Sequence, residues 1–227
     1  MSADTQKRVA GEAAAALIES GMTVGMGTGS TAALFVEALA ARNLKIRGVA
    51  TSEATASLAR RLGIEVLDLD AVDGIDLCVD GADQIGPGLC LIKGGGAALL
   101  REKLVWEASK RCVAIADHSK VEGPFGRYPL PIEVVAFGHR STARRIAGAL
   151  RGCGISAAPG LREKNGAPVV TDGGNLIYDA ACGEIPDPVA LGVTLKRLTG
   201  VVEHGLFLGL AERALVATPD GVDTLWP

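Results

Sequence analysis

The sequence predicts an α/β protein whose main part is a mostly parallel sheet with helices on both faces. Two observations predict this class. Short apolar segments alternate with helical segments along the first half of the chain, and glycine-rich or acidic turns follow several of these apolar segments. A third observation is the change of rhythm after Pro129, which predicts a second, smaller α+β unit.

The first half of the chain supplies the alternation. Its helical segments have the 3.6-residue spacing of apolar positions, and Gly21 ends the first of them. Predicted helices cover residues 5–19, 32–42, 53–62 and 97–110, and predicted strands cover residues 22–26, 46–50, 65–67, 75–80, 89–93 and 112–116. Because strands buried on both faces are apolar along their whole length, these short segments favour a covered parallel sheet.

The segment after Pro129 is predicted to form a different unit. Its predicted strands cover residues 131–135, 157–161, 169–178 and 201–205, and its predicted helices cover residues 141–150 and 188–198. The resulting β-α-β-β-α-β order is typical of a ferredoxin-like unit. We expect the apolar run 214–218 to rejoin the first sheet. The expected domains are therefore a Rossmann-like domain of residues 1–128 and 206–227 and a small ferredoxin-like α+β domain of residues 129–205.

Composition and charge exclude several classes of protein. Hydrophobic residues make up 48% and charged residues 22%, which indicates a folded globular chain. A formal net charge of −3 gives no overall attraction to nucleic acid or to acidic membranes. No run approaches the ~18 apolar residues of a membrane span, and the N-terminal segment lacks the pattern of a signal peptide. The five cysteines are scattered without a C-x-x-C pair, so we expect a cytoplasmic protein.

A glycine-rich turn, VGMGTGST at residues 24–31, joins an apolar strand to a helix. The free N–H groups and the dipole of a helix start favour an anion, and the hydroxyls of Thr28, Ser30 and Thr31 suit a phosphate monoester. A dinucleotide fingerprint needs its third glycine at the position of Ser30, and no Lys-Ser/Thr pair follows as in a P-loop. Glu53 falls near the fingerprint's acidic position but also suits a helix start. The turn therefore predicts a phosphate site, with a plain tight turn as the alternative.

Acidic and basic residues follow two more predicted strands. Asp80 ends one strand and Asp83 follows it, at the carboxyl end where open α/β sheets bind ligands. Lys93 and the three glycines at residues 94–96 come next and can stabilise an oxyanion. Paired carboxylates can also hold a metal ion, but the three histidines are isolated, which favours a metal-free site. A solvated turn rich in Asp and Gly is the alternative for Asp80 and Asp83.

The helix that follows the glycines carries Glu102. Leu100, Leu104 and Ala108 form its apolar stripe, and Glu102 lies off that stripe. On this pattern alone, Glu102 is typical of a solvated helix glutamate.

Another strand is followed by an acid and a base, Asp117 and Lys120. The run Asp117-His118-Ser119 is a weak candidate for a hydrolase triad, because triad members meet across space and neighbours in sequence generally point apart.

Taken together, these motifs resemble the type A ribose-5-phosphate isomerase family. The resemblance runs nearly from end to end, through VGMGTGST, TSEAT, GIEVLDL, DLCVDGAD, LIKGGGAALLREK, IADHSK, PLPIEV, VTDGGN and TPDGV. The order and spacing of the DGAD and IKGGGAALLREK motifs are highly specific. Two positions depart from the family pattern: Gln84 replaces the usual glutamate after DGAD, near the site, and Gly173 replaces an asparagine in a turn of the small domain.

The resemblance implies the interconversion of D-ribose 5-phosphate and D-ribulose 5-phosphate through an enediol(ate), without metal or organic cofactor, in the non-oxidative pentose phosphate pathway. It implies that Glu102 moves the proton between C1 and C2. It also implies that Asp80, Asp83 and Lys93 handle ring opening and the hydroxyl protons. The substrate-binding residues that it implies are Lys7, Thr28, Gly29, Ser30, Thr31, Asp80, Gly81, Ala82, Asp83, Lys93, Gly94, Gly95, Gly96, Asp117 and Lys120.

The resemblance further implies a homo-oligomer, a dimer or a tetramer, with no nucleic-acid or membrane partner. The alternative function is a non-catalytic sugar-phosphate-sensing domain on a similar scaffold, which need not keep Glu102 and usually carries a helix-turn-helix. About two dozen residues precede the phosphate turn, too few for that motif. A nicotinamide-dependent dehydrogenase is the enzymatic alternative, disfavoured by Ser30.

Overall fold

The computed structural model describes residues 1–227, which divide into two compact units. The first unit comprises Met1–Ala82, Arg101–Glu122 and Gly209–Pro227, and the second comprises Asp83–Leu100 and Gly123–Leu208. No helix of the chain is both long enough and apolar enough to cross a membrane.

A seven-stranded sheet in the order β16-β15-β7-β4-β1-β2-β3 forms the centre of the first unit. Its strands are β1 (Thr23–Met26), β2 (Arg47–Ala50), β3 (Glu65–Leu67), β4 (Leu77–Gly81), β7 (Cys112–Asp117), β15 (Arg213–Thr218) and β16 (Gly221–Leu225). All neighbours pair in parallel except β16, which runs antiparallel to β15. The mostly parallel sheet is confirmed, and the run 214–218 does rejoin it, as β15 beside β7.

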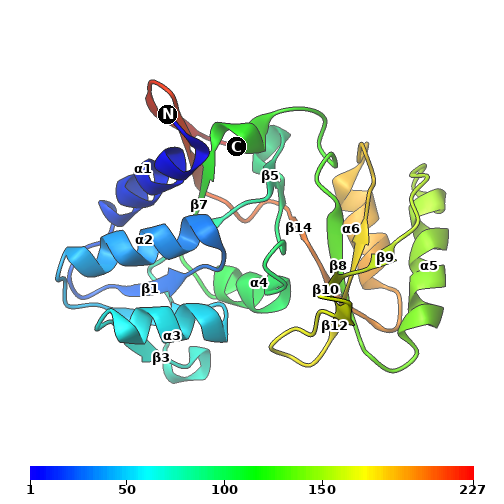
Figure 1. The fold of residues 1–227 in the computed structure, drawn as a ribbon, viewed down its shortest axis with the longest axis horizontal. Helices are drawn as coiled ribbons and strands as arrows, with labels where there is room; N and C mark the ends of the chain where they lie inside the picture. The colour runs from blue at the N-terminus through cyan, green and yellow to red at the C-terminus, as the bar shows by residue number, and fades with distance from the viewer. The chain divides into compact units, whose positions relative to one another are not determined.

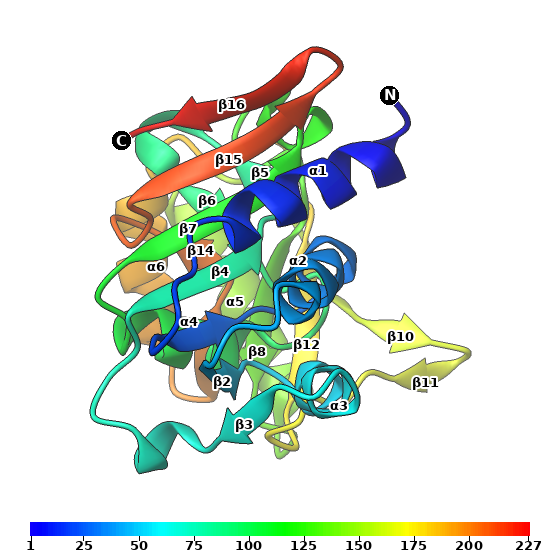
Figure 2. The ribbon, with the colours of Figure 1, turned by 90° about the vertical axis from the view of Figure 1, so that its left-hand side faces the viewer.

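The helices of this unit are α1 (Ala3–Ala15), α2 (Ser30–Ala41), α3 (Glu53–Arg61) and most of α4 (Leu99–Glu107). The part of α4 that belongs to this unit is residues 101–107. Figure 2 shows α1, α2 and α3 on one side of the sheet, where Phe35 and Leu39 of α2 enter its apolar core. The right-handed rule for parallel crossovers puts α4, in the connection from β4 to β7, on the other face. The expected cover of helices on both faces is confirmed.

The first helix ends four residues earlier than the sequence predicts. It begins where the Ser2 hydroxyl accepts the N–H of Thr5, as an N-cap does. It ends at Ala15, and the Arg42 guanidinium donates to the carbonyl oxygens of Ala15 and Ile18. These carbonyls are satisfied without a further helical turn, so the helix stops before residue 19.

An antiparallel four-stranded sheet in the order β13-β8-β12-β9 is the main sheet of the second unit. Its elements are β8 (Leu130–Val134), α5 (His139–Gly152), β9 (Gly160–Leu161), β12 (Leu176–Ala180), α6 (Pro188–Lys196) and β13 (Val201–His204). Along the chain they follow one another as β-α-β-β-α-β, so the expected ferredoxin-like order is confirmed. Figure 1 shows α5 and α6 beside this sheet, and their apolar residues Ile146 and Leu191 enter its core.

The second unit also contains five short strands, of which only β6 (Leu91–Ile92) lies within a predicted strand, residues 89–93. Three of them, β5 (Gln84–Ile85), β6 (Leu91–Ile92) and β14 (Leu206–Phe207), form a small sheet in the order β14-β6-β5. Two more, β10 (Glu163–Lys164) and β11 (Ala167–Pro168), form a hairpin. Two-residue strands have no apolar period to read. Because the small sheet joins residues 83–100 to the second unit, the limits of the units differ from the expected domain of residues 129–205.

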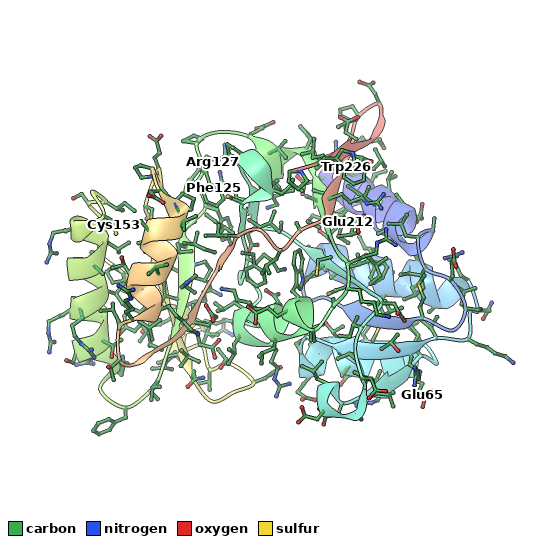
Figure 3. The ribbon with its side chains drawn as sticks, turned by 180° about the vertical axis from the view of Figure 1, so that it is seen from behind. Glu65, Phe125, Arg127, Cys153, Glu212 and Trp226 are labelled. Atoms are coloured by element: carbon green, nitrogen blue, oxygen red, sulfur yellow. The ribbon has the colours of Figure 1, made fainter.

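The edge of the large sheet carries the C-terminal residues. Figure 3 labels Glu212, which precedes β15, and Trp226, which follows β16. Arg213 joins them: its guanidinium donates to Glu212 Oε1 and lies 4.8 Å from the centre of the Trp226 ring. This cluster joins the start of β15 to the end of β16 and contains none of the predicted site residues.

Candidate active site

The phosphate turn (residues 27–31) follows β1 and is joined directly to Asp80, at the carboxyl end of β4. The N–H groups of Thr28 and Gly81 donate to Asp80 Oδ1 at 3.0 and 2.7 Å, and the Asp80 side chain is fully buried. A Cβ on Gly27 would lie 2.0 Å from that same oxygen, so only glycine permits the contact. The structure thus brings two predicted site segments of the first unit together.

Helix α2 begins within this turn. Gly29 is its N-cap residue and has a φ of 114°, a left-handed value that favours glycine. The first intrahelical bond runs from the Ala33 N–H to the Gly29 carbonyl, so the N–H groups of Ser30 and Thr31 precede any intrahelical acceptor. With the helix dipole, these N–H groups and the two hydroxyls favour an anion at this point.

Thr28 has a different environment from Ser30 and Thr31. Its hydroxyl lies 2.7, 2.8 and 3.3 Å from the hydroxyl oxygens of Thr51, Ser52 and Thr55, which are all buried. Thr55 also donates to the Gly27 carbonyl at 2.9 Å. Thr51, Ser52 and Thr55 of the TSEAT motif therefore hold the phosphate turn through hydrogen bonds, and the Thr28 hydroxyl takes part in these bonds.

Glu102 is buried, with 2% of its surface exposed, although the sequence pattern is typical of a solvated glutamate. The predicted apolar stripe of α4 is wrong, because Leu104 is 47% exposed. The buried face instead contains Leu99, Glu102, Lys103 and Trp106, which share the spacing i, i+3, i+4 and i+7. A helix that buries two ionisable side chains cannot be read from its apolar residues alone.

The remaining predicted residues of the first unit lie on three elements. Asp117 ends β7 and is buried, and its carboxylate accepts hydrogen bonds from the N–H and hydroxyl of Ser119. Lys120 is half-buried in the following short helix η3 (His118–Val121). Lys7, on α1, lies 3.5 Å from Asp4 Oδ1, an exposed partner.

The consecutive Asp117, His118 and Ser119 do not form a hydrolase triad. Nδ1 of His118 lies 2.9 Å from Oε1 of Gln6, whereas the Ser119 hydroxyl donates to Asp117. The histidine therefore does not stand between the acid and the hydroxyl. In residues 1–227, no three His, Cys, Asp or Glu side chains come together as a group that could hold a metal ion.

In the second unit, the glycine turn (residues 93–96) carries the predicted lysine. Lys93 is 1% exposed, its N–H donates to the Gly205 carbonyl at 2.9 Å, and its Nζ lies 5.4 Å from the centre of the Phe207 ring. The N–H of Gly95 donates to Oδ2 of Asp83 at 2.7 Å. The structure therefore brings Asp83 and the glycine turn together, as it does Asp80 and the phosphate turn in the first unit.

The sequence reasoning missed an ion pair that holds this turn. Arg162 Nη1 donates to the carbonyls of Gly94 and Gly95 at 2.8 and 3.1 Å. Its Nε and Nη2 donate to the two oxygens of Asp179, at 2.8 and 2.5 Å. Burial by itself lowers the pKa of the guanidinium, but the hydrogen bonds and charge of Asp179 raise that pKa above its ordinary value. No sequence motif pointed to either residue.

Tyr128 completes the surroundings of the turn. A Cβ on Gly95 would lie 2.7 Å from the Tyr128 hydroxyl oxygen and 2.6 Å from Oδ1 of Asp83. Burial raises the pKa of Tyr128, and the charge of Asp83 acts in the same direction. The hydroxyl therefore keeps its proton at neutral pH.

Gln84, one of the two departures from the family pattern, is buried beside the loop that follows η3. Its Nε2 donates to the Pro124 carbonyl at 2.7 Å, and its Oε1 accepts the N–H groups of Gly126 and Tyr128 at 2.9 and 3.2 Å. Phe125 of this loop, labelled in Figure 3, packs closely over Gly86. Both ends of the Gln84 amide thus hold backbone groups.

Comparisons with known proteins agree with the resemblance. The family model for ribose 5-phosphate isomerase A (phosphoriboisomerase A) matches residues 47–221. The ribose-5-phosphate isomerase A of Caulobacter sp. (strain K31) is 63% identical over 227 residues, which cover 100% of both chains. A ribose 5-phosphate isomerase structure from Plasmodium falciparum superposes with a TM-score of 0.93 at 35% identity and covers 99% of both chains. A D-ribose-5-phosphate isomerase in complex with phospho-erythronic acid gives a TM-score of 0.92 at 35% identity, covering 100% of both chains.

Proposed function

Because the chain belongs to the ribose 5-phosphate isomerase A family, we propose that it interconverts D-ribose 5-phosphate and D-ribulose 5-phosphate. The observation that carries this function is the 63% identity to a curated isomerase along the entire chain. The alternative of a non-catalytic sugar-phosphate sensor is not favoured, because the buried Glu102 that it need not keep is present.

The proposed chemistry moves a proton between C1 and C2 of the open-chain sugar. Such a step needs a positioned carboxylate base and a positive counterpart for the enolate oxygen. We assign the base to Glu102, and we assign the stabilisation of the oxygen to Lys93 and the N–H groups of the glycine turn. Burial supports both assignments, because low dielectric strengthens such interactions and Glu102 and Lys93 are 2% and 1% exposed.

Asp80 and Asp83 are proposed to handle ring opening and the hydroxyl protons. Each carboxylate accepts a hydrogen bond from a backbone N–H of its own unit: Thr28 for Asp80 and Gly95 for Asp83. These contacts fix one oxygen of each carboxylate and orient the other.

The phosphate is proposed to bind at the start of α2, through Gly29, Ser30 and Thr31, with Lys7, Lys120 and Asp117 near it. The Thr28 hydroxyl is assigned to the support of the turn, and Gly81 and Ala82 to backbone contacts with the sugar. A solved relative bound to phospho-erythronic acid supports a phosphorylated sugar-like ligand. Phosphate binding away from the reacting carbons supplies orientation for the chemical step.

We also propose a cytoplasmic homo-oligomer, a dimer or a tetramer. The cytoplasmic assignment is supported by the five cysteines, none of which forms a disulfide bond. The oligomer follows from the family resemblance, and exposed apolar side chains such as Phe137 and Val189, at 94% and 61%, are consistent with it. Size-exclusion chromatography with light scattering measures the number of chains in the oligomer.

The experiment that tests the function is an isomerase assay. The purified protein, dialysed against a chelator, is mixed with D-ribose 5-phosphate, and the formation of the ketose is followed. We expect D-ribulose 5-phosphate without any added nicotinamide or metal. A chain that binds the sugar phosphate without forming the ketose would instead be a sensor.

A further inference from the structure

The glycine turn depends on contacts from outside itself for its conformation. Gly94 has a φ of 103°, which side-chain-bearing residues rarely adopt, and Gly95 has no room for a Cβ beside Asp83 and Tyr128. Three consecutive glycines have little conformational preference of their own, because glycine populates both halves of φ space. Other groups must therefore select the one conformation that faces the N–H groups in a useful direction.

The peptide group between Gly94 and Gly95 is held at both ends. Its N–H donates to Asp83 Oδ2 at 2.7 Å, and its carbonyl oxygen accepts from Arg162 Nη1 at 2.8 Å. The same Nη1 reaches the Gly95 carbonyl at 3.1 Å, so it also holds the next peptide group. The chain has no cis peptide bonds, and in a trans peptide the N–H points opposite to the carbonyl. Two carbonyls bound to Arg162 therefore turn the N–H groups of Gly95 and Gly96 away from the guanidinium.

Arg162 is itself fixed on the antiparallel sheet. It lies between β9 and β10, its N–H donates to the Ile177 carbonyl at 2.8 Å, and its carbonyl accepts the N–H of Val169 at 2.9 Å. The guanidinium forms a two-point contact with Asp179, and the two side chains are 16% and 30% exposed. Because Nε and Nη2 of the planar guanidinium bind Asp179, the remaining nitrogen, Nη1, points toward the glycine turn.

We propose that Arg162 is a positioning residue for the isomerisation: held by Asp179, it sets the orientation of the peptide group between Gly95 and Gly96, whose N–H stabilises the enediolate oxygen, while the Gly95 N–H is bound by Asp83. This inference rests on the proposed function, because it assigns Arg162 an effect on the glycine turn and none on the substrate directly. The guanidinium also polarises the two carbonyls, which strengthens the N–H groups of the same peptides as donors. Asp83 and Tyr128 are further titratable groups beside the turn.

Two variants test the proposal. Arg162→Lys keeps the charge but loses the fork that binds Asp179 and the two carbonyls together, and Asp179→Asn keeps the shape but weakens the hold on Arg162. We expect kcat to fall about tenfold to a hundredfold in Arg162→Lys, below the 10²–10³-fold typical of deleting an oxyanion donor outright. We expect KM for D-ribose 5-phosphate to change less than about threefold, and Asp179→Asn to show a smaller loss of kcat with the same pattern.

The matched control is Arg111→Lys. Arg111 also makes a two-point contact with a carboxylate, Glu212, at 2.6 and 3.2 Å, but donates to no carbonyl of the glycine turn. This variant should keep its kcat, and the thermal midpoints of all three variants, measured alongside, show how much each loses in stability alone.

A direct readout is hydrogen exchange of the Gly95 amide in protein labelled with ¹⁵N-glycine. It should accelerate in Arg162→Lys and remain slow in Arg111→Lys, because only the first loosens the Gly95 to Asp83 hydrogen bond. Unchanged kcat and unchanged Gly95 exchange in Arg162→Lys overturn the proposal, and so does a fall in kcat matched by the loss of folded protein. If the wild-type chain does not form the ketose, the proposed function fails, and the Gly95 exchange still decides whether Arg162 positions the turn.

Discussion

Replacing Gln84 by glutamate, the residue usual in the family, should lower the free energy of unfolding by an amount that follows from the three hydrogen bonds of Gln84. One oxygen of the new side chain can still accept the N–H groups of Gly126 and Tyr128. The other oxygen replaces Nε2 and faces the Pro124 carbonyl, which lies 2.7 Å from that nitrogen. Two acceptors cannot share a hydrogen bond, so the folded protein favours the protonated carboxyl, and its pKa rises above the ordinary value.

The magnitude follows from linkage between protonation and folding. An unfolded glutamate has a pKa of about 4.3, so holding it protonated costs up to about 3.7 kcal/mol at pH 7 and about 1 kcal/mol at pH 5. The sign is fixed: below pH 4.3 both states carry the proton and the penalty vanishes. As the pH rises, the unfolded chain releases its proton while the folded chain keeps it, and the variant loses stability relative to the wild type. The loss levels off above the raised pKa.

The assay is urea unfolding of Gln84→Glu and of the wild type at pH 5 and at pH 7. Gln6→Glu is the control, because Gln6 is also buried but its Oε1 lies 2.9 Å from His118 Nδ1, a group that can pair with a carboxylate. It should lose less stability than Gln84→Glu between the two pH values. An equal stability difference from wild type at both pH values would refute the reasoning for Gln84→Glu. In the folded variant, kcat/KM should change less than about tenfold, or ~1.4 kcal/mol, and a hundredfold gain would instead make position 84 a proton-transfer site.

Four further outcomes are expected. Glu102→Gln should lower kcat at least ~10²-fold in steady-state assays with the fold intact, whereas Glu107→Gln, exposed on the same helix, should not. Gly27→Ala should destabilise the protein by about 1–3 kcal/mol in urea unfolding, because the new Cβ would lie 2.0 Å from Asp80 Oδ1. Gly152→Ala, with nothing within 4 Å, is its control. Unphosphorylated ribose should show a far lower kcat/KM than D-ribose 5-phosphate, and equal values would contradict the phosphate site. Activity should survive dialysis against EDTA, and a loss restored by a divalent ion would contradict the metal-free assignment.

The elements that the sequence predicted well are those with a repeated apolar pattern. The buried strands β1, β4 and β7 are apolar because both faces are covered, and each ends within two residues of its predicted limits. Because these strands are parallel, their carboxyl ends meet one edge of the sheet. Asp80 and Asp117 could therefore be placed at that edge before any contact was known.

Helix α4 shows where apolar periodicity fails. The pattern places Leu104 inside and Glu102 outside, and the structure has them the other way round, at 47% and 2% exposed. The pattern assumes that a helix buries its apolar residues, but α4 buries two ionisable side chains, Glu102 and Lys103, at a cost that the rest of the fold must offset. Only the resemblance to a family gave Glu102 a role.

Arg162 marks a different limit of sequence reasoning. It donates to backbone carbonyls 67 and 68 residues earlier in the chain, and a carbonyl oxygen is present at every position whatever its side chain. A motif such as KGGG therefore identifies groups that can react but is silent on what fixes their direction. The same holds for Gln84, whose partners are three backbone groups of residues 124–128. If the order of the glycine turn depends on Arg162, a chain with the same turn and no arginine at this place keeps the Ala97 N–H, 3.0 Å from the Gly94 carbonyl, but needs another donor for the Gly95 carbonyl.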